Sequence, residues 1–457
     1  MPCTYSLERA TGTRLGLADR KPFAMPGARP QYNPDRPCRI EHLKLEVAID
    51  FRTKTVRGTC TLTVRAVADA VASIPVDALH LVIESVKAGG RKARWEPTAE
   101  GLSVSFPRPL KAGQRIDVAV AYRVTEPKLG LYFIGPEPGY PDKPVQAWSQ
   151  GQDNDSQNWF PCHDAPNAKS TTEMIATVPE DMFALSNGRL LKVVRNPRSK
   201  TRTFHWREAV PHATYLVTLA AGRFTELKTR AGRTPVTYYV QPGREADGKR
   251  AFGKTPAMIR FFERKLGVPY PYEKYAQVAV YDFIFGGMEN TSATTQTDLT
   301  LHDARAHLDF SSDPLVAHEL AHQWFGDLLT CKDWSHGWLN EGFATYLEAC
   351  WTEHDLGGEE FRYEMLANAR AYLDEDARSY RRPIVTNVYA EPIDLFDRHL
   401  YQKGSWVLHM LRNRLGEEAF SASLNRYLRD NARGSVETVD LQRAIETTTG
   451  RNLQPFF

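Results

Sequence analysis

The spacing of apolar residues changes once along this chain, and that change constrains the fold more than any other feature. Between residue 40 and about residue 221, apolar residues occupy every second position in runs such as HLKLEVAIDF (42–51) and RIDVAVAYRV (115–124). This is the period of a half-buried strand. From Asp313 onward, almost every segment has the spacing of a helix. The pattern predicts a multidomain α+β protein, with antiparallel sheets first and a mainly helical part second.

The length and the turn signals divide the chain further. At 457 residues it is too long for one core, and roughly two to four domains are expected. Residues 1–35 contain several Pro and Gly and little periodicity, which is typical of an extended arm. The strand-like alternation continues to about 222–228. We therefore predict a β domain over 36–225 and a mainly helical domain over 226–457.

Composition and charge exclude several classes of protein. The 58 basic and 55 acidic residues nearly cancel, so we expect no nucleic-acid partner. No apolar run approaches the roughly 20 residues of a membrane span, and the N-terminus has no signal-peptide core. We expect a soluble cytoplasmic protein, although a secreted protein that has lost its signal peptide would look the same. The six cysteines form no CxxC pair and are interpreted as reduced thiols: Cys3, Cys38, Cys60, Cys162, Cys331 and Cys350.

The stretch HELAHQWFGD (318–327) carries the first chemical signal. Asp313 suits an N-cap, Pro314 suits the first helical position, and Gly326 suits a stop. His318 and His322 then share one helix face, so both imidazoles can reach one metal ion, while the intervening Glu319 flanks it. A solvated helix face would give the same letters. The apolar residues on both sides favour a buried helix, where such a cluster without a metal would be costly.

A catalytic zinc needs a third protein ligand and one open position. The segment WLNEGFATYLEACW (338–351) has helical spacing and places Glu341 near its start, 19 residues after His322. That length allows the first helix to end and an antiparallel helix to bring Glu341 alongside. Glu341 could instead be a first-turn glutamate favoured by the helix dipole. Glu348 is a rival ligand, which we interpret as a supporting carboxylate.

With these motifs in this order, the chain resembles the M1 family of zinc aminopeptidases, in the gluzincin group that includes leukotriene A4 hydrolase. Three further stretches agree: FGGMEN (285–290), LYQKG (400–404) and SQGQDNDSQNWFPCHDAPNAK (149–169). The resemblance covers about residues 40–457. It implies a saddle-like N-terminal β domain and a thermolysin-like catalytic domain over 226–457. The further C-terminal helical domains of the family are expected to be absent.

The resemblance also implies the chemistry of the centre. One zinc ion per chain is expected on His318, His322 and Glu341. Glu319 is expected to take a proton from the attacking water, and Tyr401 to donate its hydroxyl to the oxyanion. Asp327 and Asn340 are candidates for orienting the ligands.

In the same family pattern, the GxMEN segment selects substrates with a free N-terminus. Glu289 is expected to pair with the substrate α-ammonium, and Gln150 to add a hydrogen bond. The small residues Gly286 and Gly287 leave room for the substrate backbone.

The remaining positions concern specificity. Phe285 and Met288 are expected to line the pocket for the first side chain, which argues for apolar or long side chains. Many aminopeptidases carry Glu where this chain has Gln152, while the leukotriene A4 hydrolase branch carries Gln.

These features predict a zinc-dependent aminopeptidase acting on peptides with a free N-terminus. The sequence leaves its oligomeric state open, with a monomer slightly favoured. Two alternatives remain open. One is a bifunctional epoxide hydrolase and aminopeptidase, which Gln152 and GGMEN permit. The other is a poorly active or non-catalytic scaffold, because the family's C-terminal region is expected to be missing.

Overall fold

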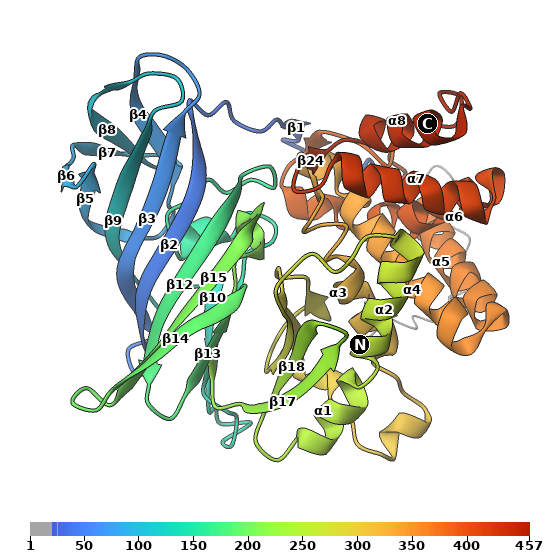
Figure 1. Ribbon diagram of the computed structural model, residues 1–457, viewed down its shortest axis with the longest axis horizontal. Helices are drawn as coiled ribbons and strands as arrows, with labels where there is room; N and C mark the ends of the chain where they lie inside the picture. The colour runs from blue at the N-terminus through green and yellow to red at the C-terminus, as the bar shows by residue number, and fades with distance from the viewer. Residues whose placement is uncertain (1–20, 25) are drawn as a thin grey trace.

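The protein is described by a computed structural model, which covers residues 21–24 and 26–457 (Figure 1). Most of the expected N-terminal arm, together with Cys3, lies outside the described residues. Within the arm, β1 (Arg29–Pro30) pairs antiparallel with β23 (Val388–Tyr389), far along the chain. The other five cysteines are buried and form no disulfide.

The N-terminal half forms three sheets, drawn at the left of Figure 1. Long strands such as β2 (Cys38–Asp50) alternate buried and more exposed residues as expected; in β2, Leu43, Leu45 and Val47 are buried between more exposed neighbours. The eight-stranded sheet has the order β14 (Arg189–Asn196), β15 (Thr201–Ala213), β12 (Lys169–Pro179), β2 (Cys38–Asp50), β3 (Thr55–Ala66), β9 (Arg115–Thr125), β5 (Val82–Ala88), β6 (Arg91–Lys92).

Two smaller sheets complete this half. The four-stranded sheet has the order β10 (Gly130–Ile134), β11 (Gln146–Gln150), β16 (Leu219–Gly222), β13 (Phe183–Ser186). The three-stranded sheet has the order β4 (Val71–Asp77), β8 (Gly101–Leu110), β7 (Trp95–Thr98). The prediction of antiparallel sheets holds for the pairs in these sheets except β2 with β12, which is parallel. Period-2 spacing shows which face of a strand is buried but carries no signal for its direction.

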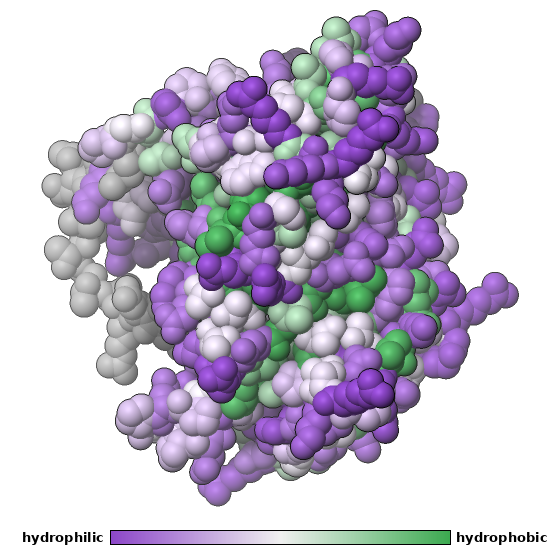
Figure 2. Space-filling view, turned by 90° about the vertical axis from the view of Figure 1, so that its left-hand side faces the viewer, coloured by the Kyte–Doolittle hydropathy of each residue, from purple (hydrophilic) through white to green (hydrophobic). Residues whose placement is uncertain are grey.

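The outward face of this half is shown in Figure 2. Hydrophilic residues cover most of it, while apolar residues gather in patches near its middle.

The chain enters the second half between Gly222 and Thr225. A five-stranded sheet begins there, in the order β17 (Thr225–Ala231), β18 (Thr234–Val240), β19 (Tyr275–Val280), β21 (Ala293–Thr297), β20 (Gly287–Met288). Helices follow: α1 (Glu245–Phe252), α2 (Thr255–Leu266), α3 (Asp313–Ala321), α4 (Trp338–Leu356), α5 (Gly358–Arg378), α6 (Gly404–Leu415), α7 (Glu417–Asp430) and α8 (Thr438–Thr449). The predicted fold class, a β-rich domain followed by a mainly helical one, is confirmed.

The helix that carries the histidines differs in detail from the prediction. Ser312, not Asp313, is the residue before α3, and the helix ends at Ala321 rather than near Gly326. His322 is the C-cap residue, and the chain then turns through Gly326, whose φ is +133°. A short parallel pair, β22 (Thr330–Cys331) with β24 (Ser435–Val436), follows the turn. Among the described helices, none is long and apolar enough to cross a membrane.

Candidate active site

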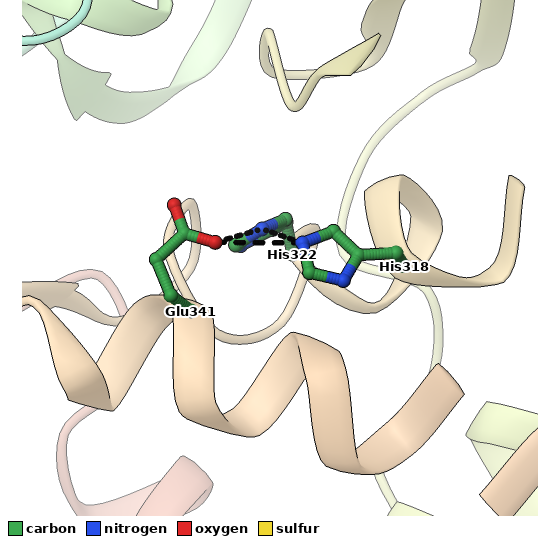
Figure 3. Close-up of side chains that lie close together, drawn as sticks. All are labelled: His318, His322 and Glu341. Carbon is green, nitrogen blue, oxygen red and sulfur yellow. Dashed lines mark hydrogen bonds and ion pairs between the residues drawn. The ribbon is translucent and has the colours of Figure 1, made fainter. Parts of the chain in front are cut away.

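Three candidate metal ligands converge where α3 meets the start of α4 (Figure 3). His318 and His322 come from the end of α3, and Glu341 comes from the first turn of α4. The Nε2 atoms of the histidines are 3.2 Å apart. The Glu341 Oε2 atom lies 3.4 Å from His318 Nε2 and 3.2 Å from His322 Nε2. All three side chains are buried.

These distances fit a zinc ion. Nitrogen and oxygen ligands lie roughly 2.0–2.1 Å from a tetrahedral zinc, so any two of them are about 3.3 Å apart. His318 Nδ1 donates to Glu348 Oε2 at 3.1 Å, and His322 Nδ1 donates to the Phe325 carbonyl at 2.9 Å. When each imidazole is neutral with its proton on Nδ1, its lone pair lies on Nε2, the atom that faces Glu341, as metal ligation requires. Glu348 serves as a hydrogen-bond acceptor for His318 in this arrangement.

Glu319 lies on α3 between the histidines and is buried against β20. A Cβ atom at Gly287 would lie only 2.5 Å from the Glu319 carboxyl carbon, so a side chain at residue 287 would clash with this group. Burial raises the pKa of Glu319 to about 8, against the opposing effect of the two histidines. A carboxyl group with a pKa near neutrality is suited to taking up a proton and releasing it again.

Glu289 directly follows β20 and is 98 % hidden from solvent, with 2 % exposure. One of its carboxylate oxygens lies in a group with ligand atoms of Glu319 and His322, all within 4.8 Å of one another. Burial raises the pKa of the Glu289 carboxyl, with the neighbouring Glu341 acting in the same direction and His322 against it. The structure thus places a second carboxylate beside the candidate metal ligands.

The N-terminal domain contributes to the same place through Gln150 on β11. Its Nε2 contacts the Met288 sulfur at 3.2 Å, and both residues are buried. Gln150 Oε1 and Gln152 Nε2 are buried without a hydrogen-bond partner among the described residues. A buried polar atom without a partner is costly unless a ligand or water satisfies it.

Tyr401 reaches the centre from a one-turn π-helix, His399–Lys403, immediately before α6. Its ring stacks on His318, with ring centroids 6.2 Å apart and planes 22° apart. Single π-turns often occur at functional sites.

Other predicted positions are less directly connected with the centre. Phe285 is 41 % exposed and contacts Phe283 edge-on, and the Gly286 carbonyl accepts a bond from Thr297. Asp327 reaches His322 through its backbone, because its N–H donates to the His322 carbonyl at 3.0 Å. Asn340 bonds to Cys331 and Tyr215.

Two residues of the site were not predicted from the sequence. Tyr215 donates to Glu289 Oε1 at 3.2 Å, and Gln323 Nε2 donates to the Glu289 carbonyl at 3.0 Å. Tyr215 lies in the run TYLVTLAAGRF, whose letters indicate only a strand. Gln323 stands inside HELAHQWFGD, where the two histidines dominate the pattern.

Comparison with known proteins agrees with this geometry. Residues 39–216 match the peptidase M1 N-terminal domain, and residues 250–457 match the peptidase family M1 domain. The chain therefore belongs to peptidase family M1, and the resemblance found in the sequence is confirmed.

Among its relatives is Aminopeptidase M1 of Arabidopsis thaliana, 34% identical over 68% of this chain and 36% of that protein. Another is Aminopeptidase M1-A of Oryza sativa subsp. japonica, 32% identical over 78% of this chain and 41% of that protein. The chain spans less than half the length of these curated relatives.

Solved structures match over most of this chain and over most of their own length. The M1 zinc metallopeptidase of Deinococcus radiodurans, bound to a Tyr-Ser-Ala substrate, has a TM-score of 0.76 at 25% identity. The match covers 91% of this chain and 92% of that chain. A two-domain M1 zinc metallopeptidase bound to L-tryptophan matches with the same TM-score at 26% identity.

Proposed function

We propose that the chain is a zinc-dependent aminopeptidase that removes the first residue from peptides with a free N-terminus. The observation that carries this proposal is the buried Glu289 carboxylate beside the candidate metal ligands. A peptidase that cuts inside a chain has no use for an anionic group at this position. A peptidase that must recognise an α-ammonium group needs an anionic group there.

In this proposal, His318, His322 and Glu341 hold one zinc ion. When bound, zinc polarises the scissile carbonyl and makes a water molecule acidic near neutral pH. Glu319 removes a proton from the attacking water as its oxygen bonds to the carbonyl carbon. The same carboxyl then delivers the proton to the amide nitrogen, and the carbon–nitrogen bond breaks.

Glu289 and Gln150 select the substrate. The α-ammonium group of the first residue pairs with the Glu289 carboxylate, and it donates to Gln150 Oε1, the buried acceptor described above. Charge-assisted bonds of this kind are about twice as strong as neutral ones. A substrate with an acetylated amine loses the positive charge that pairs with Glu289 and keeps a single N–H donor.

Tyr401 acts on the oxygen of the scissile carbonyl group. Its hydroxyl donates to the oxygen that becomes negatively charged as water adds. The stacking of its ring on His318 supports this role, because it keeps the phenol beside a candidate zinc ligand. Donors of this kind contribute about 10²–10³-fold to the rate.

The experiment that tests the proposal is fluorophore release from a panel of unblocked aminoacyl amides. Matching N-acetylated amides and a zinc chelator are run in parallel, and bound metal is measured by atomic emission. Chelator-sensitive cleavage of the unblocked amides alone is expected. Equal cleavage of the acetylated amides, or cleavage that survives removal of the metal, would refute the proposal.

A further inference from the structure

Tyr215 is a residue of the N-terminal domain that reaches into the catalytic half. It lies in a short 3₁₀ helix, Thr214–Leu216, directly after β15, and it is 1% exposed. Its ring packs edge-on against Trp334, with ring centroids 5.1 Å apart. The ring therefore belongs to the packing between the two halves, and the hydroxyl group points to the candidate active site.

Three hydrogen bonds in series define what the Tyr215 hydroxyl does. The Cys331 N–H donates to Asn340 Oδ1 at 3.0 Å, so the Asn340 amide nitrogen must face the other way. That nitrogen donates to the Tyr215 oxygen at 3.3 Å. An amide NH₂ group only donates, so the single phenolic hydrogen remains for Glu289 Oε1, at 3.2 Å.

The backbone of Glu289 is fixed separately, from the side of α3. Gln323 Nε2 donates to the Glu289 carbonyl, and Gln323 Oε1 accepts from the Ser292 N–H at 2.8 Å. These bonds hold the main chain at Glu289 and again at Ser292, three residues later. They do not reach the Glu289 side chain, which the bond from Tyr215 restrains.

This restraint matters because of what surrounds the carboxylate. Glu289 lies in one group with Glu319 and His322, within 4.8 Å. A Glu289 side chain without a fixed donor could turn toward His322 instead of toward a substrate. With one oxygen held by Tyr215, the other oxygen remains for an incoming cation.

We propose that Tyr215 is a positioning residue that holds the Glu289 carboxylate ready for the substrate α-ammonium group. This inference rests on the proposed aminopeptidase function. It adds that recognition of the free N-terminus depends on the N-terminal β domain through a hydroxyl group, in addition to Gln150. The hydroxyl acts through Glu289 and does not itself touch the reacting atoms.

The test is Tyr215→Phe, which keeps the ring against Trp334 and removes the hydroxyl. Ordering one free side chain on binding should raise KM for unblocked leucyl amide about three- to tenfold, with kcat changed less than about twofold. Because Tyr215 acts through Glu289, the variant should have no further effect on KM in a Glu289→Ala background. Tyr122→Phe is the matched control, since the Tyr122 hydroxyl is buried in β9 without a hydrogen-bond partner among the described residues.

A binding measurement separates this inference from the proposed activity. L-leucine and 4-methylpentanoate, which is the same acid without the amine, are titrated calorimetrically into the zinc-loaded protein. Tyr215→Phe should weaken leucine binding about three- to tenfold and leave 4-methylpentanoate binding unchanged. Equal weakening of both ligands, an unchanged leucine affinity, or additive effects of the Tyr215 and Glu289 variants would overturn the inference. If the wild-type protein cleaves no amide, the proposed function fails, while this titration still decides the role of Tyr215.

Discussion

A close approach of α4 and α6, at Gly342 and Gly404, leads to a prediction about stability and activity together. A Cβ atom added at Gly404 would lie 2.8 Å from the Gly342 Cα atom, and one added at Gly342 would lie 2.9 Å from the Gly404 Cα atom. Gly342 directly follows the candidate ligand Glu341. Gly404 directly follows the π-turn that carries Tyr401. The contact between the two glycines therefore sets the separation of these two functional side chains.

The size of the effect follows from the distances. Ordinary van der Waals contact for a Cβ atom begins at 3.4 Å, so Gly404→Ala requires the helices to separate by roughly 0.6 Å. Overpacking of this kind costs about 1–3 kcal/mol, and the better helix propensity of Ala offsets up to about 1 kcal/mol. We expect a net loss of about 1–2 kcal/mol in the free energy of unfolding. For a domain of this size, the melting temperature should fall by roughly 2–8 °C.

The same displacement should affect catalysis more than metal binding. A misplacement of about 1 Å can lower a rate on the order of 100-fold. For the smaller shift of roughly 0.6 Å, we therefore expect kcat to fall roughly tenfold. Scanning calorimetry and fluorophore release measure the two effects on one preparation. Gly358→Ala is the control, because its added Cβ atom would meet nothing nearer than Arg362 Nη1 at 3.7 Å. A Gly404→Ala protein that melts and turns over like wild type would refute the packing argument.

Four further outcomes are expected. Glu319→Gln should lower kcat by about 10²–10⁴-fold while bound zinc, measured by atomic emission, stays near the wild-type level; near-wild-type turnover would remove Glu319 from the reaction. Glu289→Ala should reduce kcat/KM strongly for unblocked amides in the fluorophore assay, and an equal loss on N-acetylated peptides would contradict an anchor role. Tyr401→Phe should lower kcat about 10²–10³-fold with little change in KM; an unchanged rate would leave Tyr401 a purely structural residue. Lys169 is half-buried with its Nζ donating to the Asp327 and Leu328 carbonyls, and desolvation of the amine lowers its pKa to about 7 from 10.5. Between these values the unfolded chain binds more protons, so the contribution of Lys169 to stability rises with pH from about 7 to about 10. Lys169→Met should flatten that rise in urea unfolding at pH 7 and pH 9.5, and an unchanged slope would show that Lys169 stays charged in the folded protein.

The predicted and observed folds agree best where a local pattern was available. Alternation with a period of two predicted the strands of the N-terminal half, since a strand with one buried face must place apolar side chains at every second residue. The parallel pairing of β2 with β12 was not predicted, because strand partners far apart in sequence leave no mark in either strand's own pattern. The end of α3 at Ala321 was also missed, because the turn through Gly326 forms bonds to residues that follow it.

In the candidate site too, local patterns predicted some features, while contacts between distant segments decided others. The spacing of His318 and His322 by itself places both imidazoles on one face of a helix, because four residues are close to one helical turn. Glu341 was a candidate ligand from the helical spacing of its segment and its distance in sequence from His322, although a first-turn glutamate favoured by the helix dipole remained an alternative. Glu289 was found through a motif of a known family, and no local pattern would have placed it near the histidines. Gln323 was overlooked because its role, a bond to the Glu289 carbonyl, involves a segment more than thirty residues away.

The sequence by itself therefore determined the class of each half, the helix that carries the paired histidines, and membership of the M1 family. Only the tertiary structure decided that ligand atoms of His318, His322 and Glu341 lie about 3.2–3.4 Å apart. It also decided that Tyr215, from the other half of the molecule, holds the Glu289 carboxylate. The physical reason is that hydrophobic periodicity reports on the burial of each element, whereas a site is made by contacts between elements. Those contacts depend on how the two halves pack, and no single segment carries that information.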